Sequence, residues 1–360
     1  MAINVEKYVN VDSQDTPIIR YVEKLVYMEK YGIDINGMLG DVDENGVLGF
    51  PTGQVSLVFN GVKSIPQYVL YNKFYNYPNI VSVEFPDLEI VDNVWGLYQC
   101  FRGCSNLITA SFPKVKELRM PSGFQGCSGL ENVYMPELEI MVGMGYTFYG
   151  TNIKNINLPK VKRIQSANSC FYDTKLESID LSSVESIVGS NAATWMLASI
   201  TDLKSANLSG VRIIDNDGGN ACASYLFYND QNLESVDMSN LEEVHGGSAL
   251  EYAFAYCPKL KTMRFDKLNK IGLAEGSIGY SYYEFRYAFQ NSGIESLYFP
   301  ALDSNSFTDN EPFSNMLRNV TGCVVHFPSN IQSVIGGWAD VINGFGGTNT
   351  TVLFDLPNVE

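Results

Sequence analysis

The sequence predicts a right-handed superhelical β-solenoid, in which each coil adds one short strand to a parallel sheet and little of the chain is helical. Two observations predict it. One apolar pattern recurs along most of the 360 residues. Its anchor residue also recurs every 23 residues over four successive copies, at Leu107, Leu130, Ile153 and Leu176. Self-similarity at this period indicates stacked units that bury their faces only against their neighbours.

Each copy contains a strand signal. Apolar residues lie at the anchor, three residues later and five residues later, and the last two alternate about a polar residue, as in a half-buried strand. Residues 252–271, YAFAYCPKLKTMRFDKLNKI, form the clearest copy, with Leu260 as the anchor. Later anchor spacings widen to 27, 30, 27 and 34 residues, and the remaining anchors are Ile80, Leu203, Leu233 and Ile294.

The full pattern, F-x-x-C-x-x-L-x-x-[VIM]-x-[LMF]-[PS]-x-[LV]-x-x-[IV], resembles the BspA-like leucine-rich repeat family over roughly residues 55–328. Two features depart from more regular relatives: the coils widen after Ile187, and the asparagine ladder of ordinary leucine-rich repeats is missing. The resemblance implies a leucine-rich-repeat solenoid. It also implies a bacterial cell-surface or secreted protein that binds other surfaces.

Both ends of the chain leave the pattern, so we expect a cap at each end of a solenoid of about ten coils spanning residues 54–328. Residues 1–53 form the expected N-terminal cap, with a helix over residues 17–31 that begins at Thr16-Pro17. Residues 329–360 form the expected C-terminal cap. They hold a short helix over residues 331–342, weakened by two glycines, and a final strand over residues 351–354.

Composition excludes several classes of partner. The net charge of −16 argues against nucleic acid and anionic membrane surfaces, and no apolar stretch is long enough to span a membrane. The first residues show no signal peptide. Either a signal was removed before this start, or the protein leaves the cell by another route, or it stays inside.

Cysteine and acidic motifs indicate no cofactor or metal. Cys104, Cys127 and Cys257 share one repeat position, which predicts a column of buried thiols, with a Cys104–Cys127 disulfide as the alternative. Residues 41–46 match the first half of a calcium loop, but position twelve is a threonine, so a polar turn is favoured; residues 215–219 form a similar turn.

The outward positions of the strands become columns along the solenoid. One residue after the anchor, Glu and Lys alternate from Glu131 to Glu295, which predicts a ladder of ion pairs. Four residues after the anchor the chemistry does not repeat, so this column is where recognition is expected if the strand face binds; the alternative is an ordinary polar strand face. The candidate binding residues in this column are Tyr134, Asp180, Asp237, Arg264 and Tyr298, with His326 by extension.

A second candidate surface is the insertion at residues 272–286. It gathers Tyr280, Tyr282 and Tyr283, whose rings suit a protein or a glycan, or alternatively fill the bulge that the insertion makes. Trp195 belongs to another widened coil and has the same two interpretations.

No catalytic constellation is present. The only histidines, His245 and His326, have no Ser or Cys placed beside them by the repeat, so an enzyme is not expected. The sequence favours a non-enzymatic adhesion module of a bacterial surface or secreted protein, which binds a protein or carbohydrate ligand and does not enter membranes. The alternatives are a phage or prophage tail or fibre component, and an intracellular interaction scaffold.

Overall fold

The computed structural model describes residues 9–11, 17–21, 54–59, 61–65, 67–68, 70–219, 221–273, 283–308 and 311–358. The chain divides into two compact units. Unit 1 comprises residues 1–139 and 143–158, and unit 2 comprises residues 140–142 and 159–360.

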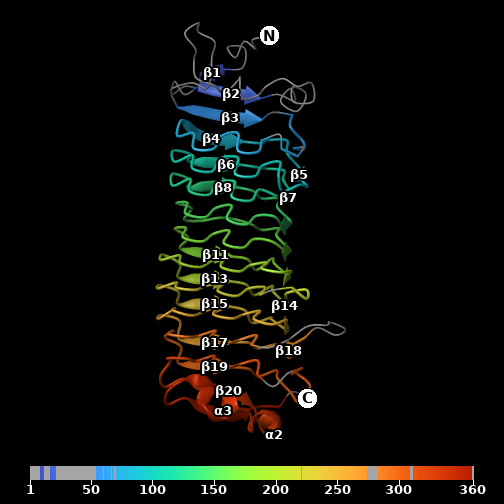
Figure 1. Cartoon of the computed structure of the whole chain (residues 1–360), viewed down its shortest axis with the longest axis vertical. Coiled ribbons are helices and arrows are strands. Elements are labelled where there is room, and N and C mark those ends of the chain that lie inside the picture. The colour runs from blue at the N-terminus through green and yellow to red at the C-terminus, as the bar shows by residue number, and fades with distance from the viewer. Residues whose placement is uncertain are drawn as a thin grey trace. The chain divides into compact units, whose positions relative to one another are not determined.

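Unit 1 contains a six-stranded sheet whose strands follow one another coil by coil (Figure 1). Its strands, in order, are β1 (Val9–Val11), β2 (Pro17–Tyr21), β3 (Val55–Phe59), β4 (Ile80–Glu84), β6 (Thr109–Ser111) and β8 (Asn132–Tyr134). β1 is antiparallel to β2, and every later pair is parallel. The pairing sets Glu84 beside Ser111 and Ser111 beside Tyr134, in the expected register.

Unit 2 repeats this strand column in two sheets. One holds β11 (Ser178–Asp180), β13 (Ser205–Asn207) and β15 (Ser235–Asp237). The other holds β17 (Thr262–Arg264), β19 (Ser296–Tyr298), β20 (Val324–Pro328) and β21 (Thr351–Leu356), all parallel. These strands confirm a parallel β-solenoid with little helix.

The expectation of one strand per coil is wrong, because most coils contain a second short strand. In unit 1 these are β5 (Ile90–Val91) and β7 (Glu117–Leu118). In unit 2 they are β9 (Ile140–Met141), β10 (Arg163–Ile164), β12 (Ser186–Val188), β14 (Ile213–Asp215), β16 (Glu243–His245) and β18 (Lys270–Gly272). Each of these second strands contains the buried apolar residue eleven places after the anchor, such as Leu118 or Ile214. The sequence did not reveal them, because strands of two or three residues are too short to show alternation.

A turn segment precedes each anchor and forms the third side of the coil. Its backbone amides alternate between the coil itself and the next one. Tyr225 N donates to Glu251 O at 2.8 Å, whereas Tyr228 N donates to Tyr225 O at 3.2 Å. The segment contains a left-handed residue seven or eight places before the anchor in coil after coil, for example Gln99 with φ +50° and Tyr225 with φ +56°.

The two ends differ from expectation in different ways. A helix beginning at Pro17 is wrong: residues 17–21 form β2, where proline, as the first residue of the strand, needs no N–H. Residues 22–31 lie outside the described residues. At the C-terminal end the single expected helix is four short turns, namely the 3-10 turn at Ser329–Ile331, α2 (Gln332–Ile335), α3 (Ala339–Ile342) and the 3-10 turn at Gly344–Gly346. The predicted final strand is present as β21.

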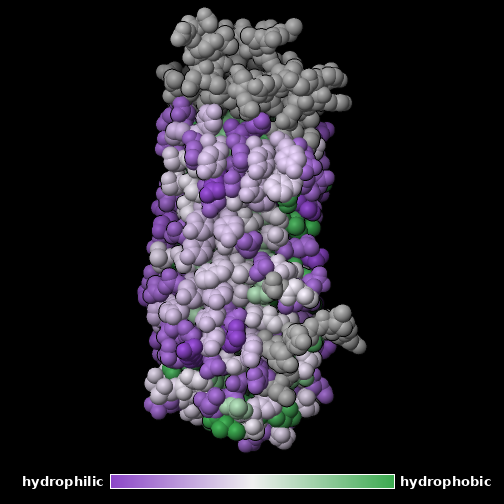
Figure 2. All heavy atoms as spheres, in the orientation of Figure 1, coloured by the Kyte–Doolittle hydropathy of each residue, from purple (hydrophilic) through white to green (hydrophobic). Residues whose placement is uncertain are grey.

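The interior of each unit is a stack of apolar side chains from equivalent positions of successive coils. In unit 1 Phe85 stacks on Phe112 with ring centroids 5.1 Å apart, and in unit 2 Phe265 stacks on Phe299 at 5.2 Å. On the visible surface of Figure 2 hydrophilic and pale residues dominate. The green, hydrophobic residues are most prominent near α2 and α3, where Ile342 is 73% exposed.

The seven cysteines, all of them described residues, are buried free thiols, so the alternative Cys104–Cys127 disulfide is not formed. The shared position has a specific use. Cys127 Sγ donates to Phe101 O at 2.9 Å in unit 1, and Cys257 Sγ donates to Phe227 O at 3.0 Å in unit 2. Burial raises the pKa of both thiols well above the ordinary value, so they are inert packing groups.

Candidate binding surfaces

Three of the predicted column positions meet in unit 2. Parallel pairing of β17, β19 and β20 sets Arg264 beside Tyr298 and Tyr298 beside His326. The Arg264 guanidinium lies 4.6 Å from the centre of the Tyr298 ring, and the His326 ring stacks on Tyr298 at 4.4 Å with an interplanar angle of 5°. His326 Nδ1 donates to Asp355 of β21, at 2.9 Å from Oδ1. We call Arg264, Tyr298, His326 and Asp355 the strand-face row.

Its neighbours fix this row before any ligand arrives. Arg264 Nε donates to Asp266 Oδ1 at 3.0 Å, which holds the guanidinium in place. Because Arg264 covers one face of the Tyr298 ring and His326 lies on the other, Tyr298 has its ring edge and hydroxyl left for contact. A rigid amphipathic ring flanked by a cation is the type of residue that dominates binding energies at interfaces.

The two predicted aspartates of the column have a structural contact each. Asp180 and Asp237 lie in register through Asn207 on β13. Asp180 Oδ1 accepts from Ser182 N at 2.9 Å, and Asp237 Oδ1 accepts from Ser239 N at 3.0 Å. Each carboxylate therefore closes the turn that ends its own strand. These turn contacts lie outside the strand-face row, and a binding role for the two aspartates stays a prediction.

Tyr134 is the predicted site residue of unit 1. Its side chain is 57% exposed, and the residues paired beside it are Ser111 on one side and Asn157 on the other. Both neighbours are small, so the ring of Tyr134 is accessible.

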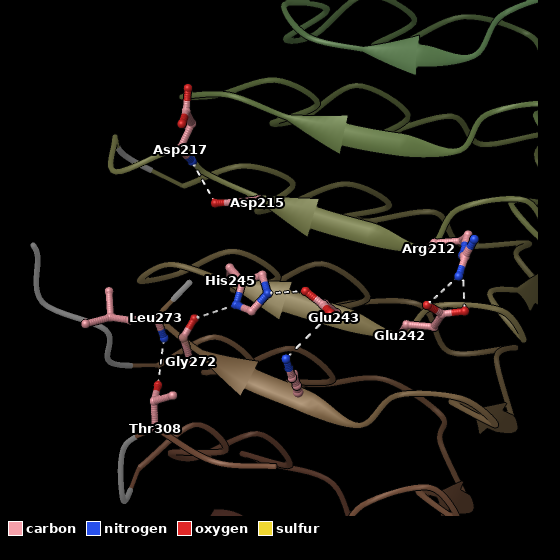
Figure 3. Close-up of polar contacts among 10 residues, drawn as sticks. Arg212, Asp215, Asp217, Glu242, Glu243, His245, Gly272, Leu273 and Thr308 are labelled. Carbon is pink, nitrogen blue, oxygen red and sulfur yellow. Dashed lines mark hydrogen bonds and ion pairs between the residues drawn. The ribbon is translucent and has the colours of Figure 1, made fainter. Parts of the chain in front are cut away.

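The tyrosines of the insertion are only partly described. Tyr280 and Tyr282 lie outside the described residues. Tyr283 is half-buried, with the Arg286 guanidinium 4.6 Å from its ring centre. The insertion begins at Gly272, which has a φ of +128°, and a Cβ there would clash with Thr308 Oγ1. Thr308 Oγ1 also accepts from Leu273 N at 2.7 Å (Figure 3).

His245 serves the same corner of unit 2. Figure 3 shows its ring between Glu243 and Gly272. Nδ1 donates to Gly272 O at 3.2 Å, and Nε2 lies 2.7 Å from Glu243 Oε2. The Nδ1 bond joins β16 to β18, whereas Nε2 contacts Glu243 of the same strand. This buried histidine holds two strands together, and neither of these ring contacts is to a Ser or Cys that could be a nucleophile.

The predicted ion-pair ladder one residue after the anchor is wrong in position. Among the described residues, only Lys261 and Glu295 of that column form an ion pair, at 3.0 Å. The other side chains extend separately into water, which solvates them well. The ladder instead lies nine residues after the anchor, where charges also alternate in the sequence. In unit 2 it pairs Lys162 with Glu185 at 3.0 Å, and Arg212 with Glu242 through two hydrogen bonds of 2.9 and 3.1 Å.

The surface that sequence reasoning missed most completely is on the turn segments of unit 2. Four aromatic rings from successive coils stack there, with centroid distances of 4.1 Å for Trp195–Tyr225 and 4.8 Å for both Tyr225–Tyr252 and Tyr252–Tyr287. Tyr228 lies beside them, at 5.1 Å from Trp195 and 5.5 Å from Tyr225. The recurring aromatic residue before the anchor was a signal in the sequence, but it lies ahead of the strand pattern.

Unit 1 has an aromatic cluster on its own turn segments. Trp95 is 39% exposed and Tyr68 is 53% exposed, and their ring centroids are 6.0 Å apart. Tyr71 stacks on Tyr98 at 5.2 Å, and both lie within ring-contact distance of Trp95. The turn segments of both units thus carry aromatic surface.

The part of the chain that the structure describes holds no group of three or more His, Cys, Asp or Glu side chains placed to bind a metal ion. It also holds no helix with the length and apolar character needed to span a membrane.

Coils with short parallel strands and stacked apolar columns, without an extended helix in the described ranges, define a solenoid of the leucine-rich-repeat class. The sequence profile described as "BspA type Leucine rich repeat region (6 copies)" matches residues 67–197 and 204–275, which is more than half of the chain. The chain belongs to this BspA-type leucine-rich repeat family. No curated protein matches it.

Solved structures similar to this chain include leucine-rich repeat proteins. A leucine-rich repeat protein from Bacteroides ovatus is 15% identical, with 74% of this chain and 88% of that chain covered and a TM-score of 0.32. The pneumococcal vaccine antigen PcpA is 12% identical, with 88% and 82% covered and a TM-score of 0.36. The leucine-rich repeat domain of APL1B is 14% identical, with 84% and 87% covered and a TM-score of 0.23.

Proposed function

We propose that this chain is a non-enzymatic adhesion module of a bacterial surface or secreted protein, and that it recognises a protein or glycan through its strand face. The observation that carries the proposal is the strand-face row. In the one outward column whose chemistry does not repeat, Arg264, Tyr298 and His326 come from three adjacent strands and hold each other in place. Repeat coils of this family supply the scaffold on which such a row can vary without disturbing the core.

Binding is tested with three single variants, Tyr134→Ala, Arg264→Ala and Tyr298→Ala. The probes are an immobilised panel of purified extracellular proteins and a glycan array. Loss of a central aromatic or arginine anchor weakens binding by about 30-fold, the equivalent of about 2 kcal/mol. Asn157→Ala is the matched control, since it removes a small polar side chain from the same column. Binding that survives all three variants unchanged contradicts the strand-face assignment.

Location is tested independently by fractionating producing cells and blotting for the protein. Protein on the surface or in the medium supports the adhesion module. Protein confined to the cytoplasm overturns that part of the proposal and favours a scaffold or a particle component.

A further inference from the structure

The aromatic residues on the turn segments of unit 2 occupy backbone positions that do not suit them. Trp195, Tyr225, Tyr252 and Tyr287 have φ values of +57°, +56°, +55° and +56°. Bulky residues rarely adopt this left-handed conformation, whereas Asn and Gly adopt it readily. Two of these turn segments place Asn at their second left-handed position, at residue 229 and residue 291, and the other two place Ser199 and Tyr256 there. Asn would therefore cause less backbone strain at the first left-handed position, but none of the four consecutive coils has Asn there.

Stacking explains only part of this choice. We define the aromatic strip as Trp195, Tyr225, Tyr252, Tyr287 and the adjacent Tyr228. Its first four rings cover one another's faces, and each is half-buried, so the exposed part of each tyrosine is its edge with the hydroxyl. Burial, with a contribution from nearby Glu251, raises the pKa of Tyr225 to about 12. The tyrosine hydroxyls thus remain protonated donors at neutral pH.

At one end of the strip, the face of Trp195 turned toward the preceding coil has no stacked ring among the described residues. Tyr225 covers one face of Trp195, but the equivalent residue in the preceding coil is Ser169, which is small and buried. Tyr172 stands to the side of this opening, 6.2 Å from Trp195 with its ring inclined by 58°. The Tyr172 hydroxyl accepts from Ser199 Oγ at 3.3 Å. An indole face with a polar wall beside it is available at this point.

The strip carries few charges, and the nearest unpaired one among the described residues lies at its far end, where the Arg318 guanidinium is 5.4 Å from the centre of the Tyr287 ring. The four stretches 191–199, 221–229, 248–256 and 283–291 contain Glu251, Glu284 and Arg286 as their only charged residues, in a chain of net charge −16. Arg286 Nε donates to Glu251 Oε1 at 2.6 Å, so these two charges neutralise each other, and Glu284 is fully buried. The exposed chemistry is phenol, indole, amide and hydroxyl, which is the composition of an adaptable, uncharged binding face.

We propose that the aromatic strip binds a neutral, extended polysaccharide that runs along the stack of coils. Successive tyrosines are 4.8 Å apart, close to the advance of one pyranose ring in an extended chain, so each coil offers one hydroxyl donor to one sugar. The open face of Trp195 takes the C–H face of the sugar at the end of the strip. The inference rests on the proposed role as a binding module, but it uses a different side of the coil.

The test is affinity electrophoresis of the whole chain in native gels containing hydroxyethyl cellulose or glucomannan, with alginate as the anionic comparison. The variant is the double substitution Tyr225→Asn and Tyr252→Asn, because Asn accepts the left-handed backbone. Tyr146→Asn is the matched control, because Tyr146 has a φ of +57° at the same turn position in unit 1, is 42% exposed and belongs to neither the strip nor the strand-face row. Retardation by a neutral polysaccharide, an increase of at least tenfold in Kd for the double variant and no change for Tyr146→Asn are expected. Tyr298→Ala is measured alongside to test the strand face.

Three results overturn the proposal: no retardation by either neutral polysaccharide, retardation by alginate alone, or a double variant that binds within twofold of the wild type. Loss of glycan binding in Tyr298→Ala alone would instead assign the glycan to the strand face. Circular dichroism melting reports whether the double variant folds. If it does not, Tyr225→Phe with Tyr252→Phe keeps the stack and removes the donors, and unchanged binding by that pair also overturns the proposal.

Discussion

The buried surroundings of the Asp340 carboxyl group disfavour its ionised form. Asp340 lies near the start of α3, is 8% exposed, and its Oδ2 has no hydrogen-bond partner. Burial, together with the charge of Glu311, raises its pKa from 3.8 to about 6. The folded state therefore holds this proton more tightly than the unfolded state. The contribution of the protonated Asp340 carboxyl to stability is complete below pH 3.8 and is lost as the pH rises through about 6.

The substitution Asp340→Asn removes the charge and keeps the shape. A pKa difference of about 2 units corresponds to about 3 kcal/mol, and access of water to the group reduces this to about 1–3 kcal/mol at pH 8. We expect the variant to be more stable than the wild type by that amount at pH 8 and nearly equal to it at pH 4. For a unit of about 200 residues this is a rise in Tm of about 2–10 °C at pH 8.

Trp338, two residues before Asp340 in the sequence, is the fluorescent probe of unfolding. Its fluorescence during urea or thermal unfolding reports on this end of unit 2 when Trp95 and Trp195 are replaced by Phe in both proteins. Asp202→Asn is the control, since it changes an exposed carboxylate elsewhere in unit 2. An Asp340→Asn variant that is equally stable or less stable at pH 8, or whose advantage is the same at pH 4, would refute the reasoning.

Three other substitutions test different contacts by thermal unfolding. Asp230 is fully buried with one unpaired oxygen, and burial raises its pKa well above the ordinary value, so Asp230→Asn should raise Tm at pH 7; a lower Tm would contradict this. Glu242→Gln removes the exposed ion pair with Arg212 and should lower Tm only slightly, with the difference disappearing in 1 M salt; a large, salt-independent loss would show that the pair does more. Phe265→Ala should destabilise unit 2 by about 3–5 kcal/mol, because it leaves a cavity in the phenylalanine stack, and a loss below about 1 kcal/mol would show that the stack closes over it.

The strand column could be predicted because its signal is local and repeated. Apolar residues such as Met263 and Phe265 flank a polar residue, and this spacing recurs at each anchor, which fixes both the strand and its register. The second strands gave no such signal, since the pair Glu117–Leu118 has one inward residue and no alternation. Their hydrogen bonds depend on how neighbouring coils stack, which no single coil encodes.

Two errors have identifiable physical causes. Thr16-Pro17 suits the start of a helix, but proline at the first residue of a strand is equally acceptable, and local sequence does not separate the two. The ion-pair ladder was placed one residue after the anchor because charges alternate there. They also alternate nine residues after the anchor, where the side chains of Arg212 and Glu242 actually meet.

The sequence contained a signal for a structural role of Asp180 and Asp237 that competes with a binding role. Each is followed two residues later by a serine, and Asn207 has the same spacing to Ser209. Asp or Asn at this distance commonly accepts a hydrogen bond from the backbone N–H of the second residue. The structure shows that bond in all three cases. At these three positions of the non-repeating column, the side chain therefore closes the turn that follows the strand.

Repetition alone does not distinguish columns that hold the solenoid together from columns that bind. The cysteine column repeats because each thiol satisfies a phenylalanine carbonyl of the neighbouring coil, as Cys127 does for Phe101. The aromatic strip also repeats, but it places Tyr225 and Tyr252 in a left-handed backbone that Asn would fill at lower cost. Local sequence rules that are broken over several consecutive coils need a compensating gain. Ring stacking is one such gain. Stacking also leaves the hydroxyl edges in solvent, and the proposed binding of a polysaccharide by these edges is the other.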